Sequence, residues 1–227
     1  KIHKMYNKGY LNYLKRFIDS KPCFLDNTVT KTNYISWEMF LKDIEPLSGL
    51  KYQVGKIIKT NVSNAWLKMY ELLSSYNIIP NRSSITTLHL CEAPGTFVSC
   101  FNHFIYTRTK SKYIWEANTL PFTELNALTD FYGFIRKYKK NWVMEDVTNM
   151  SFILNDYKKY DVITGDGGIH CNPNQYSCQE EITAKLIYME FLNIIFKLKI
   201  HGNAILKMYL PCDLKSNKSI IYLASKM

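Results

Sequence analysis

The feature that most constrains the fold is a regular alternation of short apolar segments with helical patterns from about residue 85 onward. The apolar segments have the continuous character of buried strands, and apolar residues at helical spacing fill the intervals between them. The predicted strands are residues 88–91, 113–115, 142–144, 161–164 and 204–209. Strands that alternate with helices predict a mainly parallel sheet flanked by helices, with ligands at the carboxyl ends of the strands.

Residues 1 to about 80 have a different pattern, in which apolar residues recur at helical spacing without strands between them. This spacing predicts helices over 10–18 and 37–44, and a third helix that begins after Ser63, whose hydroxyl suits an N-cap. A chain of 227 residues without repeats or low-complexity linkers has the size of one large domain. The sequence therefore predicts a single domain over 1–227, with a helical N-terminal extension at 1–80 and an α/β core at 81–227.

The balance of charge narrows the choice of partner. The 29 Lys and Arg residues exceed the 19 Asp and Glu residues, and the net charge of +10 favours nucleic acid over a neutral partner. No apolar run approaches the roughly 18 residues of a membrane span, and no signal peptide opens the chain, so no membrane partner is expected. The six cysteines lie scattered and lack zinc-site spacing, so we expect thiols in a reducing, intracellular compartment and no metal site.

A loop with the chemistry of a ligand site, Glu92-Ala93-Pro94-Gly95-Thr96-Phe97, directly follows the first predicted strand. Gly95 would let the backbone approach a ligand closely, because it carries no side chain. The following helix would direct free backbone N–H groups at this ligand. The loop lacks both G-x-G-x-x-G and G-x-x-x-x-G-K-[ST], which disfavours a dinucleotide dehydrogenase and a P-loop NTPase. An ordinary strand-to-helix turn is the alternative.

Three charged residues stand out from the apolar pattern around them. Asp166 lies between glycines at the end of the fourth predicted strand and would face the ligand crevice, unless it only caps its own turn. Lys207 interrupts the apolar fifth strand, which is costly unless the lysine is paired, functional or at an edge. Lys68 lies beside the apolar stripe of the third predicted helix, where a solvated lysine paired with Glu71 is the alternative.

Four motifs in this order resemble the FtsJ/RrmJ-like RNA ribose 2'-O-methyltransferases. They are Leu90–Phe97, Trp115–Leu120, Gly165–Gly168 and Ile205–Tyr209. The segment Asn64–Met69 also resembles the helix that supplies the first catalytic lysine of that family. The residues of the first two motifs are most similar to those of the Adrift-type mRNA cap methyltransferases, which are cellular or viral. The resemblance implies a Rossmann-like, S-adenosylmethionine-dependent methyltransferase fold.

The resemblance also implies a role for each matching position. The lysine, aspartate and lysine of the family's catalytic group correspond to Lys68, Asp166 and Lys207. The cofactor-binding positions correspond to Glu92, Ala93, Pro94, Gly95, Thr96, Phe97, Trp115, Asn118 and Asp146. The cofactor would be S-adenosylmethionine, which leaves as S-adenosylhomocysteine, and the reaction needs no metal.

The sequence departs from the family pattern in two places. Thr96 stands where many members have glycine, and a β-branched residue narrows the conformations open to the loop. The family's fourth catalytic residue is a glutamate on a last strand, and no residue before the final Met227 matches it. We therefore expect the C-terminal strands of the family's sheet to be missing, with a longer chain or a protein partner to supply them.

These observations predict an enzyme of mRNA capping that methylates a ribose 2'-hydroxyl of capped mRNA at the first or second transcribed nucleotide. A neutral Lys207 would take the hydroxyl proton, and Asp166 would orient the lysine groups. The basic run is expected to contact RNA phosphates, with a solvated basic face as the alternative. It contains Arg136, Lys137, Lys139 and Lys140. The alternative function is a catalytically weak, methyltransferase-like RNA-binding or scaffolding subunit. Either would act in the nucleus, in the cytoplasm or at a viral replication site.

Overall fold

The computed structural model describes residues 48–227, apart from 125–126, 155–156, 172–177 and 210–211. The predicted helices at 10–18 and 37–44 lie outside the described residues. The chain divides into two compact units. The larger unit consists of Lys51–Gly168 and Lys185–Lys207, and the smaller unit contains Ile169–Ala184 and Met208–Met227. Whether the whole chain behaves as one domain stays a prediction.

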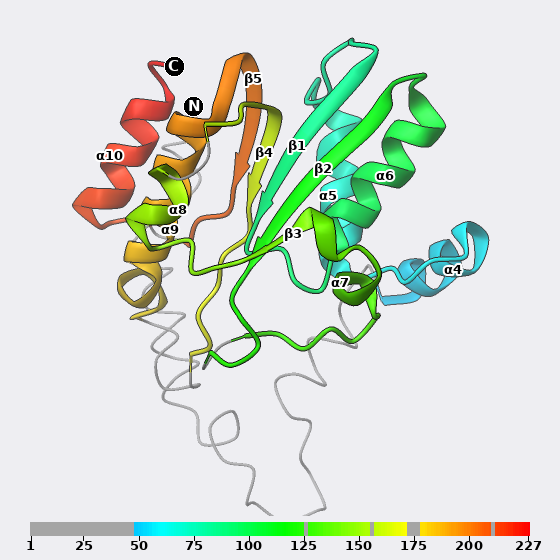
Figure 1. The fold of residues 1–227 in the computed structure, drawn as a ribbon, viewed down its shortest axis with the longest axis horizontal. Coiled ribbons are helices and arrows are strands. Elements are labelled where there is room, and N and C mark those ends of the chain that lie inside the picture. The colour runs from blue at the N-terminus through cyan, green and yellow to red at the C-terminus, as the bar shows by residue number, and fades with distance from the viewer. Residues whose placement is uncertain (1–47, 125–126, 155–156, 172–177, 210–211) are drawn as a thin grey trace, which may run out of the picture. The chain divides into compact units, whose positions relative to one another are not determined.

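The larger unit is built on a sheet of five parallel strands, as the alternation of strands and helices predicts. The strands lie side by side in the order β3-β2-β1-β4-β5 (Figure 1). Their bounds are β1 Ser84–Leu90, β2 Lys112–Thr119, β3 Trp142–Met144, β4 Tyr160–Gly165 and β5 Leu198–Leu206. The chain moves outward from β1 in one direction and returns to β4 on the other side. The carboxyl ends of β1 and β4 therefore flank the crevice in which sheets of this kind bind ligands.

Helices cover both faces of this sheet. Figure 1 shows α5 and α6 together on one side of the sheet and α8 and α9 on the other, as right-handed crossovers in opposite directions require. The helices are α4 Ser48–Ile58, α5 Asn64–Ser75, α6 Thr96–Arg108, α7 Phe134–Lys137, α8 Met150–Leu154, α9 Gln179–Lys197 and α10 Lys215–Ala224, with a 3-10 turn η2 at Lys139–Asn141. In the part of the chain that the structure describes, no helix is long and apolar enough to cross a membrane.

Helix α5 begins where the sequence predicts. The Ser63 hydroxyl is its N-cap and accepts a hydrogen bond from the Trp66 backbone N–H at 3.2 Å. The buried face of α5 packs on α6, where the Trp66 ring lies 5.6 Å from the His103 ring. This packing fixes the helix beside the sheet and leaves Lys68 exposed. The apolar periodicity did not predict α4, which precedes α5.

Strand β1 begins at Ser84, earlier than predicted, because its polar side chains are paired inside the protein. The Thr86 hydroxyl donates to Asp161 Oδ2 at 2.7 Å, and His89 Nδ1 lies 2.8 Å from Thr164 Oγ1. Burial lowers the pKa of His89 to about 3, so the imidazole is neutral. A search for continuous apolar runs misses the start of such a strand, since satisfied polar groups are compatible with burial.

The bounds of β2 and β5 differ from the prediction in ways that concern the site. Trp115 and Asn118 lie inside β2, which continues to Thr119 because β3 extends its pairing. Lys207 is the first residue after β5 and does not interrupt it. Strand β5 ends there because its partner β4 ends at Gly165. Lys207 therefore lies at the carboxyl edge of the sheet, and the prediction that it lies within the fifth strand was wrong.

Candidate active site

Asp166 and Lys207 form an ion pair at the carboxyl edge of neighbouring strands. The Lys207 Nζ lies 2.8 Å from Asp166 Oδ1 and donates to the Asp166 carbonyl at 3.0 Å. The Lys207 backbone N–H also donates to the Gly165 carbonyl at 2.9 Å, which extends the β4–β5 pairing by one step. The side chains are 39% and 30% exposed for Lys207 and Asp166, so the pair is open to a substrate. The structure thus brings together two of the three residues that the resemblance marks as catalytic.

Lys68 does not join this pair in the structure. It is exposed on α5, and within the described residues no hydrogen bond or ion pair connects it to Asp166, Lys207 or Glu71. Within the described residues, Lys68 therefore contacts neither the Asp166–Lys207 pair, as its catalytic role would require, nor Glu71, as the solvated alternative would require. The role of Lys68 in catalysis stays a prediction.

Glu92 caps helix α6 from the loop after β1. Its Oε1 accepts the backbone N–H groups of Phe97 at 2.6 Å and Val98 at 3.0 Å. The two helix amides that were expected to be free for a ligand are therefore occupied, and the expectation was wrong for them. Burial raises the pKa of Glu92 to about 8, although the two backbone bonds lower it, and the negative charge of Asp166 raises it further. Glu92 is thus a buried carboxyl group close to the Asp166–Lys207 pair.

Gly95 has a structural reason to be glycine that differs from the predicted one. Its φ is +105°, and a Cβ added there would lie 2.5 Å from Cδ1 of Phe134. The Phe134 ring therefore occupies the space that a Cβ at Gly95 would take, where we had expected a ligand to lie. Ala93 is buried in the same apolar cluster, and Thr96 begins α6. Pro94 lies half-buried between them.

The two candidate residues on β2 are occupied by protein contacts. The Trp115 ring stacks on Phe134, with centroids 5.5 Å apart and planes 13° apart. Asn118 is 1% exposed, and its Nδ2 donates to the Glu145 carbonyl at 2.7 Å and to the Val143 carbonyl at 3.3 Å. Asn118 therefore ties the end of β2 to the end of β3. Its cofactor-binding role stays a prediction that the side-chain amide itself does not support.

Asp146 follows β3 at the same edge of the sheet. Its Oδ1 accepts the Thr148 backbone N–H at 2.8 Å, which closes a short turn. Its negative charge raises the pKa of the Cys91 thiol at the end of β1, although burial and Glu190 contribute more. Asp146 therefore shares the electrostatic environment of the loop after β1, and the cofactor-binding role that the resemblance implies for it stays a prediction.

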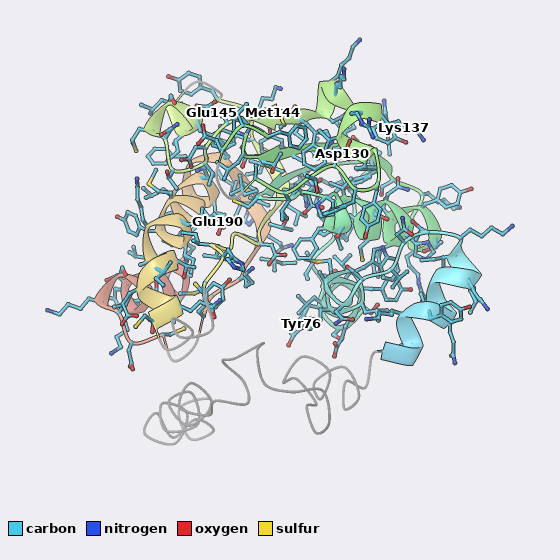
Figure 2. All side chains as sticks on the ribbon, turned by 90° about the horizontal axis from the view of Figure 1, so that it is seen from below. Tyr76, Asp130, Lys137, Met144, Glu145 and Glu190 are labelled. Atoms are coloured by element: carbon cyan, nitrogen blue, oxygen red, sulfur yellow. The ribbon has the colours of Figure 1, made fainter. Side chains whose placement is uncertain are left out.

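The four cations of the basic run are exposed on α7 and η2, beside the edge strand β3. Arg136 Nε lies 3.5 Å from Asp130 Oδ2, and Lys137 Nζ lies 5.1 Å from the centroid of the Tyr138 ring. Figure 2 shows the labelled Lys137 and Asp130 on the part of the larger unit away from Glu190. The run is accessible to an anionic partner, and among the residues that the structure describes only Arg136 of this run has a carboxylate neighbour, Asp130.

The sequence reasoning missed one residue of the site, Glu190 on α9. It is fully buried, and its Oε1 accepts the Gly167 backbone N–H at 2.9 Å, one residue after Asp166. Burial raises the pKa of Glu190 to about 8. The available signal was a single acidic residue within the apolar segment Leu186–Ile195. Among the described residues, no group of three or more His, Cys, Asp or Glu side chains is arranged to hold a metal ion.

Comparisons with known proteins give this site a context. A sequence model of the FtsJ-like methyltransferase family matches residues 61–226. The chain is 31% identical to the uncharacterized protein L511 of Acanthamoeba polyphaga mimivirus, over 97% of this chain and 30% of that protein. It is 32% identical to the cap-specific mRNA (nucleoside-2'-O-)-methyltransferase 2 of Drosophila melanogaster, over 76% of this chain and 27% of that enzyme.

Two further relatives bear on the fold and on the length of the chain. The chain is 34% identical to the probable methyltransferase EP424R of African swine fever virus, over 88% of this chain and 50% of that protein. The chain thus spans half or less of the length of these relatives. A putative ribosomal RNA methyltransferase from Plasmodium falciparum has the same fold, with a TM-score of 0.50 at 18% identity over 72% of this chain and 85% of that one.

Proposed function

The chain belongs to the FtsJ-like methyltransferase family and has its Rossmann-like fold, and we propose that it transfers a methyl group from S-adenosylmethionine to a ribose 2'-hydroxyl of capped mRNA, at the first or second transcribed nucleotide. The observation that carries this proposal is the Asp166–Lys207 ion pair at the carboxyl edge of β4 and β5. A half-buried lysine that a carboxylate holds at the open edge of the sheet could serve such a transfer beside the ribose hydroxyl.

The difficult partner in this reaction is the ribose hydroxyl, which is scarcely ionised at neutral pH. Lys207 would first release the proton that it carries in the ion pair and would then accept the hydroxyl proton as a neutral amine, while Asp166 would hold this amine in place through its carboxylate and carbonyl oxygens. Lys68 would approach from α5 once RNA is bound. Positioning of the hydroxyl supplies a large part of the acceleration, because the reacting atoms no longer have to find one another in solution.

The charges at this edge fit a cationic cofactor. Glu92, Glu190 and Asp166 lie close enough that the charge of Asp166 raises the pKa of both glutamates. Their raised pKa values keep both glutamates largely protonated near neutral pH, so the Asp166 carboxylate would supply the negative charge that attracts a sulfonium. The turn Glu92–Phe97 and Asp146 would hold S-adenosylmethionine. When bound, the cofactor supplies the electrophilic methyl group.

The substrate proposal rests on charge and on the relatives. The exposed basic run and the net charge of +10 suit a phosphate backbone. Relatives in Drosophila melanogaster, Danio rerio and Pongo abelii are named cap-specific mRNA (nucleoside-2'-O-)-methyltransferase 2. A capped substrate would place the chain in the nucleus, in the cytoplasm or at a viral replication site. A protein partner could complete the catalytic group with a glutamate.

A methyl-incorporation assay tests the proposal. The full chain is incubated with labelled S-adenosylmethionine and a series of capped RNAs that differ in which of the first two 2'-hydroxyls is already methylated. We expect incorporation that is lost when one particular position is blocked, and little incorporation into uncapped RNA. Incorporation that ignores both positions would contradict the cap 2'-O assignment.

A second candidate is a catalytically weak RNA-binding or scaffolding subunit. It is favoured by the lack of a hydrogen bond or ion pair between Lys68 and the Asp166–Lys207 pair within the described residues. This function predicts salt-sensitive RNA binding without methyl incorporation into any RNA of the series. The same assay, combined with an RNA-binding measurement, therefore distinguishes the two candidates.

A further inference from the structure

We propose that Glu190 is a positioning residue that holds the Asp166 turn against Lys207, an inference that rests on the methyl transfer proposed above. Glu190 lies on α9, beneath the carboxyl edge of the sheet, and it is labelled in Figure 2. Its side chain is 0% exposed, so it does not touch a substrate. Its influence on the reaction would pass through the backbone that carries Asp166.

The contacts of Glu190 enclose the turn on both sides of Asp166. Its Oε1 accepts the Gly167 backbone N–H at 2.9 Å. A Cβ at Gly167 would lie 2.8 Å from this same oxygen, and a Cβ at Gly165 would lie 3.1 Å from the Glu190 carboxyl carbon. The Glu190 carboxyl group thus occupies part of the space that a side chain would take on both sides of Asp166, together with Leu206 at Gly165 and Leu186 at Gly167.

The turn then transmits this constraint to the ion pair. Gly165 accepts the Lys207 backbone N–H, and Asp166 binds the Lys207 ammonium through a carboxylate oxygen and its carbonyl. A continuous set of bonds thus runs from Glu190 through Gly167 to Asp166 and Lys207. If the acceptor on Glu190 is removed, the buried Gly167 N–H loses its partner and the turn is free to shift. A displacement of about 1 Å at Asp166 would be enough to slow a positioned reaction.

The charge of Glu190 provides a signature of this role. Burial raises its pKa to about 8, the bond from Gly167 and the Lys207 ammonium lower it, and the Asp166 carboxylate raises it. The titratable groups that face it are Cys91 after β1, Asp166 after β4 and Lys207 after β5. Near neutral pH the carboxyl group is therefore protonated and adds no negative charge beneath Asp166. Above about pH 8 its ionisation would make Lys207 hold its proton more tightly.

The test compares two substitutions at this position with a matched control. Glu190→Met removes the acceptor but keeps the length of the side chain, and Glu190→Gln keeps an acceptor without a titratable group. Asn193→Leu is the control, since Asn193 is also buried on α9 but bonds only to the Met189 carbonyl of its own helix among the described residues. The measurements are kcat and KM for capped RNA across pH, cofactor affinity, and hydrogen exchange of the Gly167 amide.

We expect Glu190→Met to lower kcat by about tenfold, with cofactor affinity within about twofold, because one buried hydrogen bond to the turn is lost. The Gly167 amide should exchange faster in this variant. Glu190→Gln should restore most of the loss and should remove the inflection near pH 8 from the kcat profile. Asn193→Leu should change neither kcat nor the exchange of Gly167.

Other results would overturn the inference. The first is an unchanged kcat in Glu190→Met together with an unchanged exchange rate of the Gly167 amide. The second is an equal loss of kcat in Glu190→Met and Glu190→Gln, because equal losses would indicate that Glu190 acts only through packing. If Glu190→Met does not fold, a kcat profile across pH that is unaltered in Glu190→Gln would also overturn the inference. If the unmodified chain transfers no methyl group, the proposed function fails. The Gly167 exchange and an NMR titration of the Lys207 ammonium then still decide whether Glu190 holds the pair.

Discussion

The Lys207 ammonium meets the Asp166 carboxylate at 2.8 Å although 41 positions separate them in the chain. The parallel register of β4 and β5 produces this contact, since Gly165 pairs with Leu206 and the next residue of each strand projects from the same edge. An ion pair built on two adjacent strand ends is held by the sheet itself. The strands therefore hold the two side chains in a fixed position, as the positioning of a substrate requires.

The first prediction concerns this pair. Lys207→Ala should lower turnover on capped RNA by about 100-fold or more, because the proton acceptor for the ribose hydroxyl is lost. Asp166→Ala should have an effect of similar size, and the double variant should be little worse than either single one, since the two residues act as a unit. Calorimetry should find S-adenosylmethionine affinity nearly intact in Lys207→Ala. Additive losses, or a loss of cofactor binding that accounts for the slower turnover, would argue against this role.

The second prediction concerns Gly95. Gly95→Ala should destabilise the protein by about 2 kcal/mol or more, because the new Cβ would meet the Phe134 ring and the backbone φ is positive. Thermal or denaturant unfolding measures this change. Gly133→Ala is the matched control, since Gly133 also has a positive φ of +66° but its nearest atom would be 3.8 Å away. Adding Phe134→Leu should recover part of the Gly95→Ala loss, and no recovery would show that the ring is not the obstacle.

The third prediction is a decrease in stability with rising pH. The Glu92 carboxyl has a pKa of about 8 in the folded chain against an ordinary value of 4.5. Its contribution to stability is therefore complete below pH 4.5 and is lost progressively as the pH rises to about 8. Glu92→Gln keeps an acceptor for the α6 amides but cannot ionise.

Melting temperatures at pH 5 and pH 8 check this prediction. The melting temperature should fall between these pH values in the unmodified chain and fall less in Glu92→Gln. The remaining slope should come partly from Glu190, whose pKa is also about 8. Glu71→Gln, which removes an exposed carboxylate on α5, serves as the control. An identical slope in Glu92→Gln and the unmodified chain would contradict the argument.

Much of the fold could be predicted from the sequence, because parallel strands buried on both faces are continuous apolar runs. The β3 bounds were predicted correctly, and so was the start of α5 at its Ser63 cap. The start of β1 was missed because Thr86 is polar and its half-buried hydroxyl is paired with Asp161. No local pattern reveals such pairing, since the partners come from β4.

The candidate site was predictable to a similar extent. The strand ends bring Asp166 and Lys207 together, and a strand-by-strand reading of the sequence anticipates this. It does not anticipate that Glu92 occupies the amides of Phe97 and Val98, or that the Phe134 ring fills the space beside Gly95. Glu190 was missed because a helix residue reveals its contact with the Asp166 turn only when the helix is packed on the sheet.

The fourth prediction concerns RNA binding. Glutamine at Arg136, Lys137, Lys139 and Lys140 should flatten the dependence of log affinity on log salt by about 3, as expected for four contacts with single-stranded phosphates. Glutamine at Lys110 and Lys112, which are exposed just before β2 and at its first residue, is the control and should leave the slope nearly unchanged. Equal slopes in all three proteins would mean that the run is only a solvated face.

The most direct test of the central claim is the chemical identity of the methylated nucleoside. Capped RNA is treated with the full chain and S-adenosylmethionine, digested to nucleosides and analysed by mass spectrometry, in parallel with Lys207→Ala. We predict a 2'-O-methylated ribose at the first or second transcribed nucleotide from the unmodified chain, and none from Lys207→Ala despite retained cofactor binding. A methyl group on a base, or an equal yield from Lys207→Ala, would contradict the account.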